Sequence, residues 1–350
     1  MATVSGRGVS TGRAQADVTS GRNSADVSQR EDLANFITMI TREETPFMSS
    51  IGKTKATAIY HEWQTDELAA PGNSRLTEGA DFGTDISPIT GPHRTRLGNY
   101  TQINGKAIAV SGTRRAVDQA GVADEYAYQL KKRGTELRRD VEFDLVQSYN
   151  VASGSGTRTM GGVQSFINDD ATCAYVGDFE APATAGAGSA TVTANGANAR
   201  SALSLSDIDS VMQKIYEEGG KASRIMVSPK LRRDFSDLMV TDSGVRRNID
   251  TDGKLRQSVD VYMSDFGDLM VVPNYIMGLS NSVDFGAGAV DVADFAALIY
   301  DPQWFNVATL RPLTEVDVGQ KGDSTVGMMV EETTLEVRNP KGCGAIYGLV

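Results

Sequence analysis

Residues 128–146, YQLKKRGTELRRDVEFDLV, decide the fold, because they predict one long helix that carries charge on most of its sides. Asp124 is a suitable N-cap, so the helix should cover about residues 124–149. A helix of about 25 residues is about 37 Å long. One stripe of apolar or small residues recurs at steps of three or four and predicts the side that packs on the core. Its members are Tyr126, Ala127, Leu130, Gly134, Leu137, Val141 and Leu145.

The other sides of this helix alternate basic and acidic residues, which predicts pairs such as Lys132 with Glu136 and Arg138 with Glu142. Each exposed pair contributes only about 0.3 kcal/mol, so the pairs do not explain the helix. A thinner apolar line through Tyr128, Phe143 and Val146 lies roughly opposite the first stripe. It either contacts the next element of the same fold or faces neighbouring copies of the chain, and the periodicity leaves both interpretations open.

Composition excludes several classes of protein. The chain has 350 residues, enough for two or three domains, and a net charge of −11, which disfavours a nucleic-acid reader. There is no apolar segment of the kind that marks a signal peptide or a membrane span. The two cysteines lie far apart without metal-ligand spacing, which is typical of a reducing compartment.

The order of predicted elements indicates an α+β fold with mostly antiparallel sheets. Residues 1–27 are too polar to fold alone, and a capping box at Ser28 and Glu31 starts a helix that should end near Thr45. Two β-rich segments, 55–68 and 94–112, flank a Pro- and Gly-rich loop at 69–93. A helix capped by Ser206 should follow at about 207–218. The last three strand segments, which begin near 305, 326 and 344, fit one long meander.

Catalytic constellations are missing from the sequence. His61 and His93 lie in the two-stranded excursion, where strand packing explains them better than catalysis. Gly8–Gly12 matches a nucleophile motif but lies in the polar N-terminal segment, so chance explains the match. We therefore predict no catalytic residue, no cofactor and no metal site.

Three stretches carry a resemblance to a known family: REETPFMSSIGKTKA at 42–56, AVSGTRRAVDQAG at 109–121, and TMGGVQSFI at 159–167. With the long helix, their order resembles the major capsid (head) protein of tailed phages, the Hong Kong 97-type fold. The resemblance implies an N-terminal arm and short helix at 1–50 and an extended loop at 51–112, with its two long strands and irregular tip at 69–93. It also implies a peripheral domain at 113–203 and 296–350 that contains the long spine helix, and an axial α/β domain at 204–295.

The function implied by this resemblance is that of a structural shell subunit of the virion, made in the cytoplasm of a host bacterium. Copies would form the hexamers and pentamers of an icosahedral shell around double-stranded DNA, with only weak, non-specific contact to that DNA. A decoration protein, a scaffold and a portal stay open as further partners. The expected assembly contacts are Arg22, Arg30, Arg75, Glu78, Asp81, Lys132, Arg138, Arg139 and Glu142.

One departure from the family concerns covalent locking of the shell. Some members join a lysine of the extended loop to an asparagine, but no lysine occurs here between Lys55 and Lys106. We therefore expect non-covalent assembly, with a separate scaffold because the arm is short. An encapsulin-like compartment shares the fold and is the alternative, and a hydrolase is the remote one.

Overall fold

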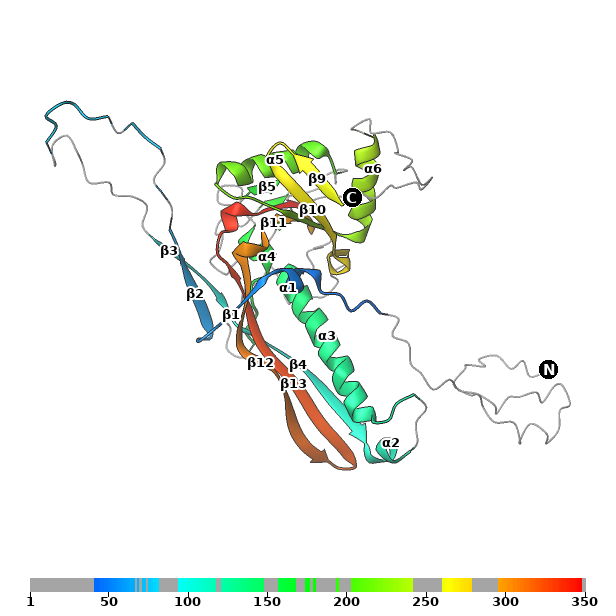
Figure 1. The fold of residues 1–350 in the computed structure, drawn as a ribbon. Helices are drawn as coiled ribbons and strands as arrows, with labels where there is room; N and C mark the ends of the chain where they lie inside the picture. The colour runs from blue at the N-terminus through cyan, green and yellow to red at the C-terminus, as the bar shows by residue number, and fades with distance from the viewer. Residues whose placement is uncertain are drawn as a thin grey trace.

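A computed structural model of the protein describes residues 41–66, 68, 71–73, 75–81, 94–117, 121–147, 157–167, 174–176, 179–180, 193–194, 203–241, 260–278 and 295–347. Within these residues one long helix joins a four-stranded sheet to a six-stranded sheet, and a two-stranded excursion projects from the body (Figure 1). The predicted polar segment at 1–27 lies outside the described residues, and so does the helix predicted after Ser28 as far as residue 40. Its predicted last part is wrong, because residues 41–45 are not helical.

The four-stranded sheet has the order β1-β12-β13-β4. Its strands are β1 (Gly52–Lys55), β12 (Phe305–Lys321), β13 (Ser324–Val337) and β4 (Gln102–Ser111). β12 and β13 form a long antiparallel hairpin, and its turn uses Gly322 at φ 70°, a conformation that favours glycine. β1 runs parallel to β12 at one edge, and β4 runs antiparallel to β13 at the other.

The long helix α3 (Glu125–Gln147) packs along this sheet and connects two separate cores. Leu137 packs with Ile108, Val110 and Met329 of the sheet. One to two turns later, the side chains of Val141, Leu145 and Val146 enter the largest core. Asp124 caps the helix as predicted, since its Oδ1 accepts from the backbone N–H of Tyr126 at 2.9 Å.

Two members of the predicted helix pattern differ from expectation. Ala127 is exposed, so it points away from the sheet, whereas Tyr126 and Leu130 pack against the core that contains Leu137. Val146 is fully buried, so this member of the second apolar line contacts its own fold and not a neighbouring copy.

The six-stranded sheet has the order β5-β14-β11-β8-β10-β9. Its strands are β5 (Ala174–Val176), β14 (Gly344–Tyr347), β11 (Phe295–Tyr300), β8 (Arg224–Val227), β10 (Gly267–Pro273) and β9 (Val261–Ser264), and it packs with α5 (Leu205–Glu217) and α6 (Pro229–Thr241). β14 pairs with β11 and β5, so the single long meander predicted for the last three strands is wrong. Ser204, not Ser206, caps α5, because its side chain and that of Asp207 form a capping box.

The excursion contains a shorter hairpin than predicted. β2 (Tyr60–Thr65) and β3 (Thr95–Tyr100) pair antiparallel, whereas β1 and β4, which flank them in sequence, belong to the four-stranded sheet. The remaining elements are α1 (Pro46–Ser50), α2 (Gly112–Ala116), α4 (Val163–Phe166), β6 (Phe179–Glu180), β7 (Thr193–Ala194), η3 (Tyr275–Gly278), η5 (Pro302–Trp304) and η6 (Pro340–Gly342). In the described part of the chain, no helix is long and apolar enough to cross a membrane.

Candidate assembly interface

The chain enters the body at α1, where Glu142 of α3 holds the first turn. Pro46 stands at the first helical position, so Thr45 precedes a helix start and not the helix end that we predicted. Glu142 Oε1 accepts from the backbone N–H of Phe47 at 2.8 Å, and Oε2 accepts from that of Met48 at 2.7 Å. These are two of the N–H groups that a helix start leaves without partners.

Glu142 also contacts the six-stranded sheet, because Asn274, directly after β10, donates to its Oε1 at 2.9 Å. The Glu142 side chain is 0% exposed, and burial raises its pKa although these three donors act in the opposite direction. The prediction of Glu142 as an exposed assembly contact is therefore wrong. Its carboxylate joins α1, α3 and the end of β10 inside one subunit.

Phe47 fixes α1 from the other side. Its ring lies 5.5 Å from that of Tyr300 and 5.6 Å from that of Phe305, centroid to centroid. Tyr300 and Phe305 pack edge to face at 5.7 Å. The three rings are fully buried, so the segment that follows the N-terminal residues is anchored in the largest core.

Several charges on the flanks of α3 are used within the subunit. Arg139 donates to the Tyr275 hydroxyl at 2.6 Å and stacks over that ring. Glu136 pairs with Arg133 at 2.5 Å, not with Lys132 as predicted. Arg138 is exposed and Lys132 is half-buried, so these two are the members of the predicted helix contacts whose side chains still face outward.

The projecting excursion carries three other predicted contacts. Arg75, Glu78 and Asp81 are exposed, and so are two leucines beside them, Leu68 at 97% and Leu76 at 59%. A leucine this exposed is costly in water unless another surface covers it. Arg22 and Arg30 lie outside the described residues.

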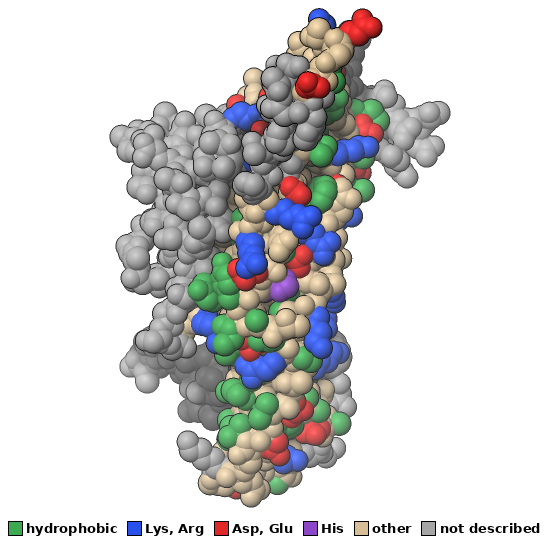
Figure 2. All heavy atoms as spheres, turned by 90° about the vertical axis from the view of Figure 1, so that its left-hand side faces the viewer, with side chains coloured by type: hydrophobic (Ala, Val, Ile, Leu, Met, Phe, Trp, Pro, Cys, Tyr) green, Lys and Arg blue, Asp and Glu red, His purple; other side chains and the backbone are tan. Residues whose placement is uncertain are grey.

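A further surface, which the sequence analysis did not single out, is the face of the four-stranded sheet opposite α3. The side chains of Gln102 and Lys106 reach Asp144 and Asp140 of α3, so the alternate residues of β4 point away from the helix. That face exposes Ile103, Val316 and Met328. Figure 2 views this side, on which hydrophobic side chains are mixed with Lys and Arg around the purple His61.

Glu332 lies directly opposite Ile103 on the neighbouring strand, so it belongs to the same face, and it holds two arginines. Its carboxylate is 2.6 Å from Arg158 Nη2 and 2.8 Å from Arg311 Nε, and it accepts from the Thr101 hydroxyl at 2.8 Å. Burial alone would raise the pKa of Glu332, but the Thr101 hydrogen bond and the two arginines lower it. No spacing in the sequence joins these residues, because they come from four distant segments.

The geometry is therefore that of a body with buried internal connections, a projecting excursion and an uncovered sheet face. A family model described as "SU10 major capsid protein" matches residues 14–350, nearly the whole chain. The chain belongs to the SU10 major capsid protein family. It is a structural subunit of a phage capsid, located in the virion and active as a homo-oligomer.

Relatives of this capsid protein agree with that assignment. The major capsid protein of Escherichia phage Phieco32 is 28% identical over 251 residues, which cover 62% of this chain and 68% of the relative. A structure of Mycobacterium phage Bobi matches with a TM-score of 0.58 at 12% identity over 92% of this chain and 96% of that one. The capsid of the native GTA particle matches with a TM-score of 0.56 at 12% identity. The match covers 94% of this chain and 98% of that one. These likenesses confirm the predicted Hong Kong 97-type fold.

Asp144 is a titrating group inside this capsid protein. Burial and, to a lesser degree, the neighbouring Asp140 raise its pKa to about 7, against the hydrogen bond from Gln102. Gln102 Nε2 donates to its Oδ2 at 2.7 Å. Near neutral pH the Asp144 side chain is therefore protonated in some subunits and ionised in others.

We expect Asp144→Asn to stabilise the subunit above neutral pH. An unfolded aspartate titrates near pH 3.9, so the favourable contribution of the folded group is complete below that value and is lost as pH rises through about 7. Asparagine keeps an acceptor for Gln102 and avoids burying a charge. Urea denaturation at about pH 8 should show a gain on the order of 2 kcal/mol that disappears near pH 4. Asp140→Asn, at a half-exposed side chain, is the control, and an equal gain there would contradict the account.

Proposed function

We propose that copies of this chain assemble into the hexamers and pentamers of an icosahedral shell that encloses double-stranded DNA. The observation that carries this proposal is the excursion, whose described residues extend away from the body and expose Leu68 and Leu76 (Figure 1). Burial of one leucine side chain contributes roughly 1.5–3 kcal/mol. In a shell, the surface of a neighbouring subunit can cover Leu68 and Leu76.

The same proposal divides the chain into an arm, an extended loop and two domains. We assign residues 1–50 to an arm, 51–112 to an extended loop with its tip at 69–93, 113–203 and 296–350 to a peripheral domain, and 204–295 to an axial domain. The core beneath α5 and α6 supports a separate axial part, whereas the largest core joins Met226 and Met277 of that part to α3. β14 crosses this division, because it follows the peripheral hairpin in sequence and pairs within the six-stranded sheet.

Charge supports weak contact with the packaged DNA. A net charge of −11 repels a polyanion, so the container does not bind its contents tightly. The arm arginines, among them Arg22 and Arg30, would supply local weak contacts. A decoration protein, a scaffold and a portal are the further partners of such a shell.

We infer a structural role without catalysis, and family membership supports that inference. Among the described residues, no group of three or more His, Cys, Asp or Glu side chains could hold a metal ion. An encapsulin-like compartment is the alternative, and the contents of purified particles decide between the two. Nucleic acid inside supports a capsid, and a cargo enzyme inside supports the alternative.

Assembly should be non-covalent, since no lysine occurs between Lys55 and Lys106 and the tip of the extended loop therefore has none. Purified particles boiled in SDS with reductant should release one species near 37.4 kDa. Unboiled particles serve as the control and should stay at the top of the gel. A ladder of covalent oligomers after boiling would contradict non-covalent assembly.

A further inference from the structure

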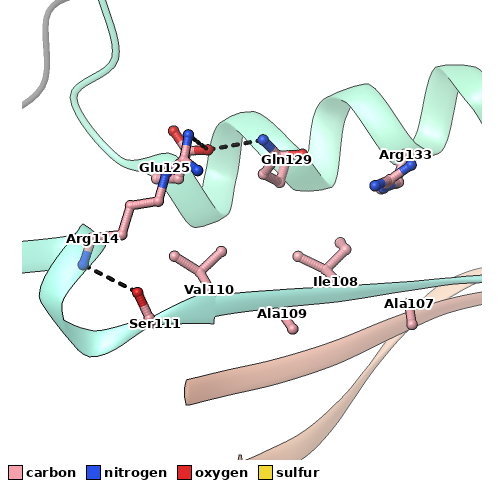
Figure 3. Close-up of a pocket in the computed structure, with 9 residues that line it drawn as sticks. All are labelled: Ala107, Ile108, Ala109, Val110, Ser111, Arg114, Glu125, Gln129 and Arg133. Carbon is pink, nitrogen blue, oxygen red and sulfur yellow. Dashed lines mark hydrogen bonds and ion pairs between the residues drawn. The ribbon is translucent and has the colours of Figure 1, made fainter. Parts of the chain in front are cut away.

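The groove between β4 and the first turns of α3 is filled by contacts of the subunit itself. In Figure 3 the side chains of Ile108 and Val110 point from β4 toward α3. Glu125 accepts from Gln129 Nε2 at 2.8 Å and lies 3.1 Å from Arg114 Nη2. These charged groups are therefore satisfied inside one subunit, unlike an apolar surface of the six-stranded sheet.

The six-stranded sheet is covered fully on one face and only partly on the other. Leu269 and Tyr262 face α5 and α6 and belong to the core beneath these helices. On the opposite face, Val272 of β10 packs against the largest core. Side chains two residues apart on a strand share a face, so Met270 lies on the same side as Val272. The cover of this face ends between these two residues of β10.

Beyond that point, three apolar side chains are exposed on β9 and β10. Met263 is 76% exposed, Met270 is 51% exposed and Val261 is 47% exposed. The register places Val261 directly opposite Met270, and Met263 lies two residues further along β9 on the same face. Single apolar residues on a surface are ordinary, whereas contiguous ones mark a surface that another segment covers. We call these three residues the β9–β10 patch.

The described chain begins close to this patch, at residues 41–45. The helix α1 that follows is held at the same sheet face, since Ser50 Oγ lies 3.1 Å from the Tyr300 hydroxyl. Tyr300 pairs with Arg224, and Arg224 pairs with Met270. Two strand spacings amount to about 10 Å, and five residues span at most about 17 Å. In Figure 1, α5 lies above β9 and β10, and the blue segment before α1 lies below them. The residues before 41 are therefore within reach of the patch.

The sequence before residue 41 has the composition to cover an apolar surface. Residues 28–40, SQREDLANFITMI, lie outside the described residues and carry Leu33, Phe36, Ile37 and Ile40 at helical spacing. From the first to the last of these, a helix rises about 10 Å, which is close to the size of the patch. A helix this short is marginal alone in water, so its apolar side needs a surface to pack on.

We propose that residues 33–40 dock as a helix on the β9–β10 patch of their own subunit. Met263 and Met270 have flexible, polarisable side chains that adapt to an incoming apolar stripe. The short tether at 41–45 raises the effective concentration of the segment at its own subunit to about the millimolar range, which favours the same chain over a second copy. The contact would join the N-terminal segment to the six-stranded sheet. It does not depend on the proposed shell function, because a single subunit can form it.

Disulfide trapping in the full-length chain tests the contact directly. We would combine Ile37→Cys with Val261→Cys, Met263→Cys or Met270→Cys in three double variants and oxidise them. At least one double variant should form a disulfide within one chain. On a non-reducing SDS gel it should run faster than the reduced monomer, because the bond closes a long loop, and reductant should remove the shift. The single variants share the native cysteines and should run with the wild type.

Two outcomes of the trapping would overturn the proposal. A disulfide-linked dimer in place of the fast band would assign the patch to a second copy. Absence of any new disulfide in all three double variants would show that the segment lies elsewhere. The gel separates these results for free subunits and for particles alike, so a failure to form particles counts against the proposed function alone.

Methionine oxidation gives a second, independent measurement. Hydrogen peroxide converts accessible methionine to the sulfoxide, which peptide mass spectrometry quantifies. Met263 and Met270 should oxidise several times more slowly in the wild type than in Ile37→Asp, which places a charge in the apolar stripe. Asn35→Asp adds the same charge on the opposite side of the helix and should keep the wild-type rate. Met160, which is fully buried, is the internal reference for an intact fold. Equal rates at the patch in all three proteins would contradict docking.

Discussion

Replacement of Glu142 by alanine should lower the free energy of unfolding by about 4 kcal/mol, because it removes the carboxylate that accepts from three buried or part-buried donors. These are the backbone N–H groups of Phe47 and Met48 and the side-chain amide of Asn274. Each unsatisfied buried donor costs about 1–3 kcal/mol. Urea denaturation of the unassembled subunit measures the change.

Glu142→Gln is the matched control. A glutamine oxygen can still accept from Phe47 and Asn274, but its amide nitrogen would face the N–H of Met48, so the loss should be smaller. The pH dependence separates the two further. Because burial raises the pKa of Glu142, its contribution is complete below the unfolded value of about 4.3 and is lost as pH rises through the folded pKa. The glutamine variant has no titrating group at this position, so its stability should lack this pH dependence. An alanine variant within 1 kcal/mol of the wild type would contradict the central position of this carboxylate.

Leu137→Asp should prevent the subunit from folding. Leu137 is 1% exposed and packs against Ile108, Val110 and Met329, so the new carboxylate would be buried in apolar surroundings. Burial of a polar group without a partner costs several kcal/mol, and an unpaired charge costs more. Thermal unfolding monitored by circular dichroism, and the yield of soluble protein, measure the effect.

Arg138→Gln makes the same change in net charge at the neighbouring, exposed position and should leave the fold intact. Comparison of the two variants separates packing from charge. A cooperative, wild-type melting curve for Leu137→Asp would show that α3 does not depend on the sheet. In that case α3 would not act as a rigid support between the two cores.

The sequence predicted α3 well because a period of three or four residues is a local property. Leu137, Val141 and Leu145 occupy the buried stripe as expected, and Asp124 caps the helix. The same pattern failed at Glu142, since a charged residue beside an apolar stripe is usually solvated. Its partners lie 95 and 132 residues away, and no spacing predicts them. Pro46 was the available signal, because proline at a first helical position marks a helix start.

The extent of the loop and the sheets was harder to predict for a related reason. β1 and β4 have the same β-rich composition as β2 and β3, and only pairing with β12 and β13 assigns them to the large sheet. Pairing between distant strands leaves no local trace. For the same reason the uncovered face of β9 and β10 became visible only in the structure, whereas the apolar period after Ser28 is visible in the sequence alone.

Electron microscopy of the purified chain, concentrated in the absence of other phage proteins, tests the central claim most directly. The account predicts closed icosahedral particles whose capsomers contain six and five copies of the 37.4 kDa subunit. Their reconstruction should show the extended loop of each subunit on its neighbour. A compact monomer that persists at high protein concentration, with no particles on the grid, would contradict the assignment of this chain as a self-assembling shell subunit.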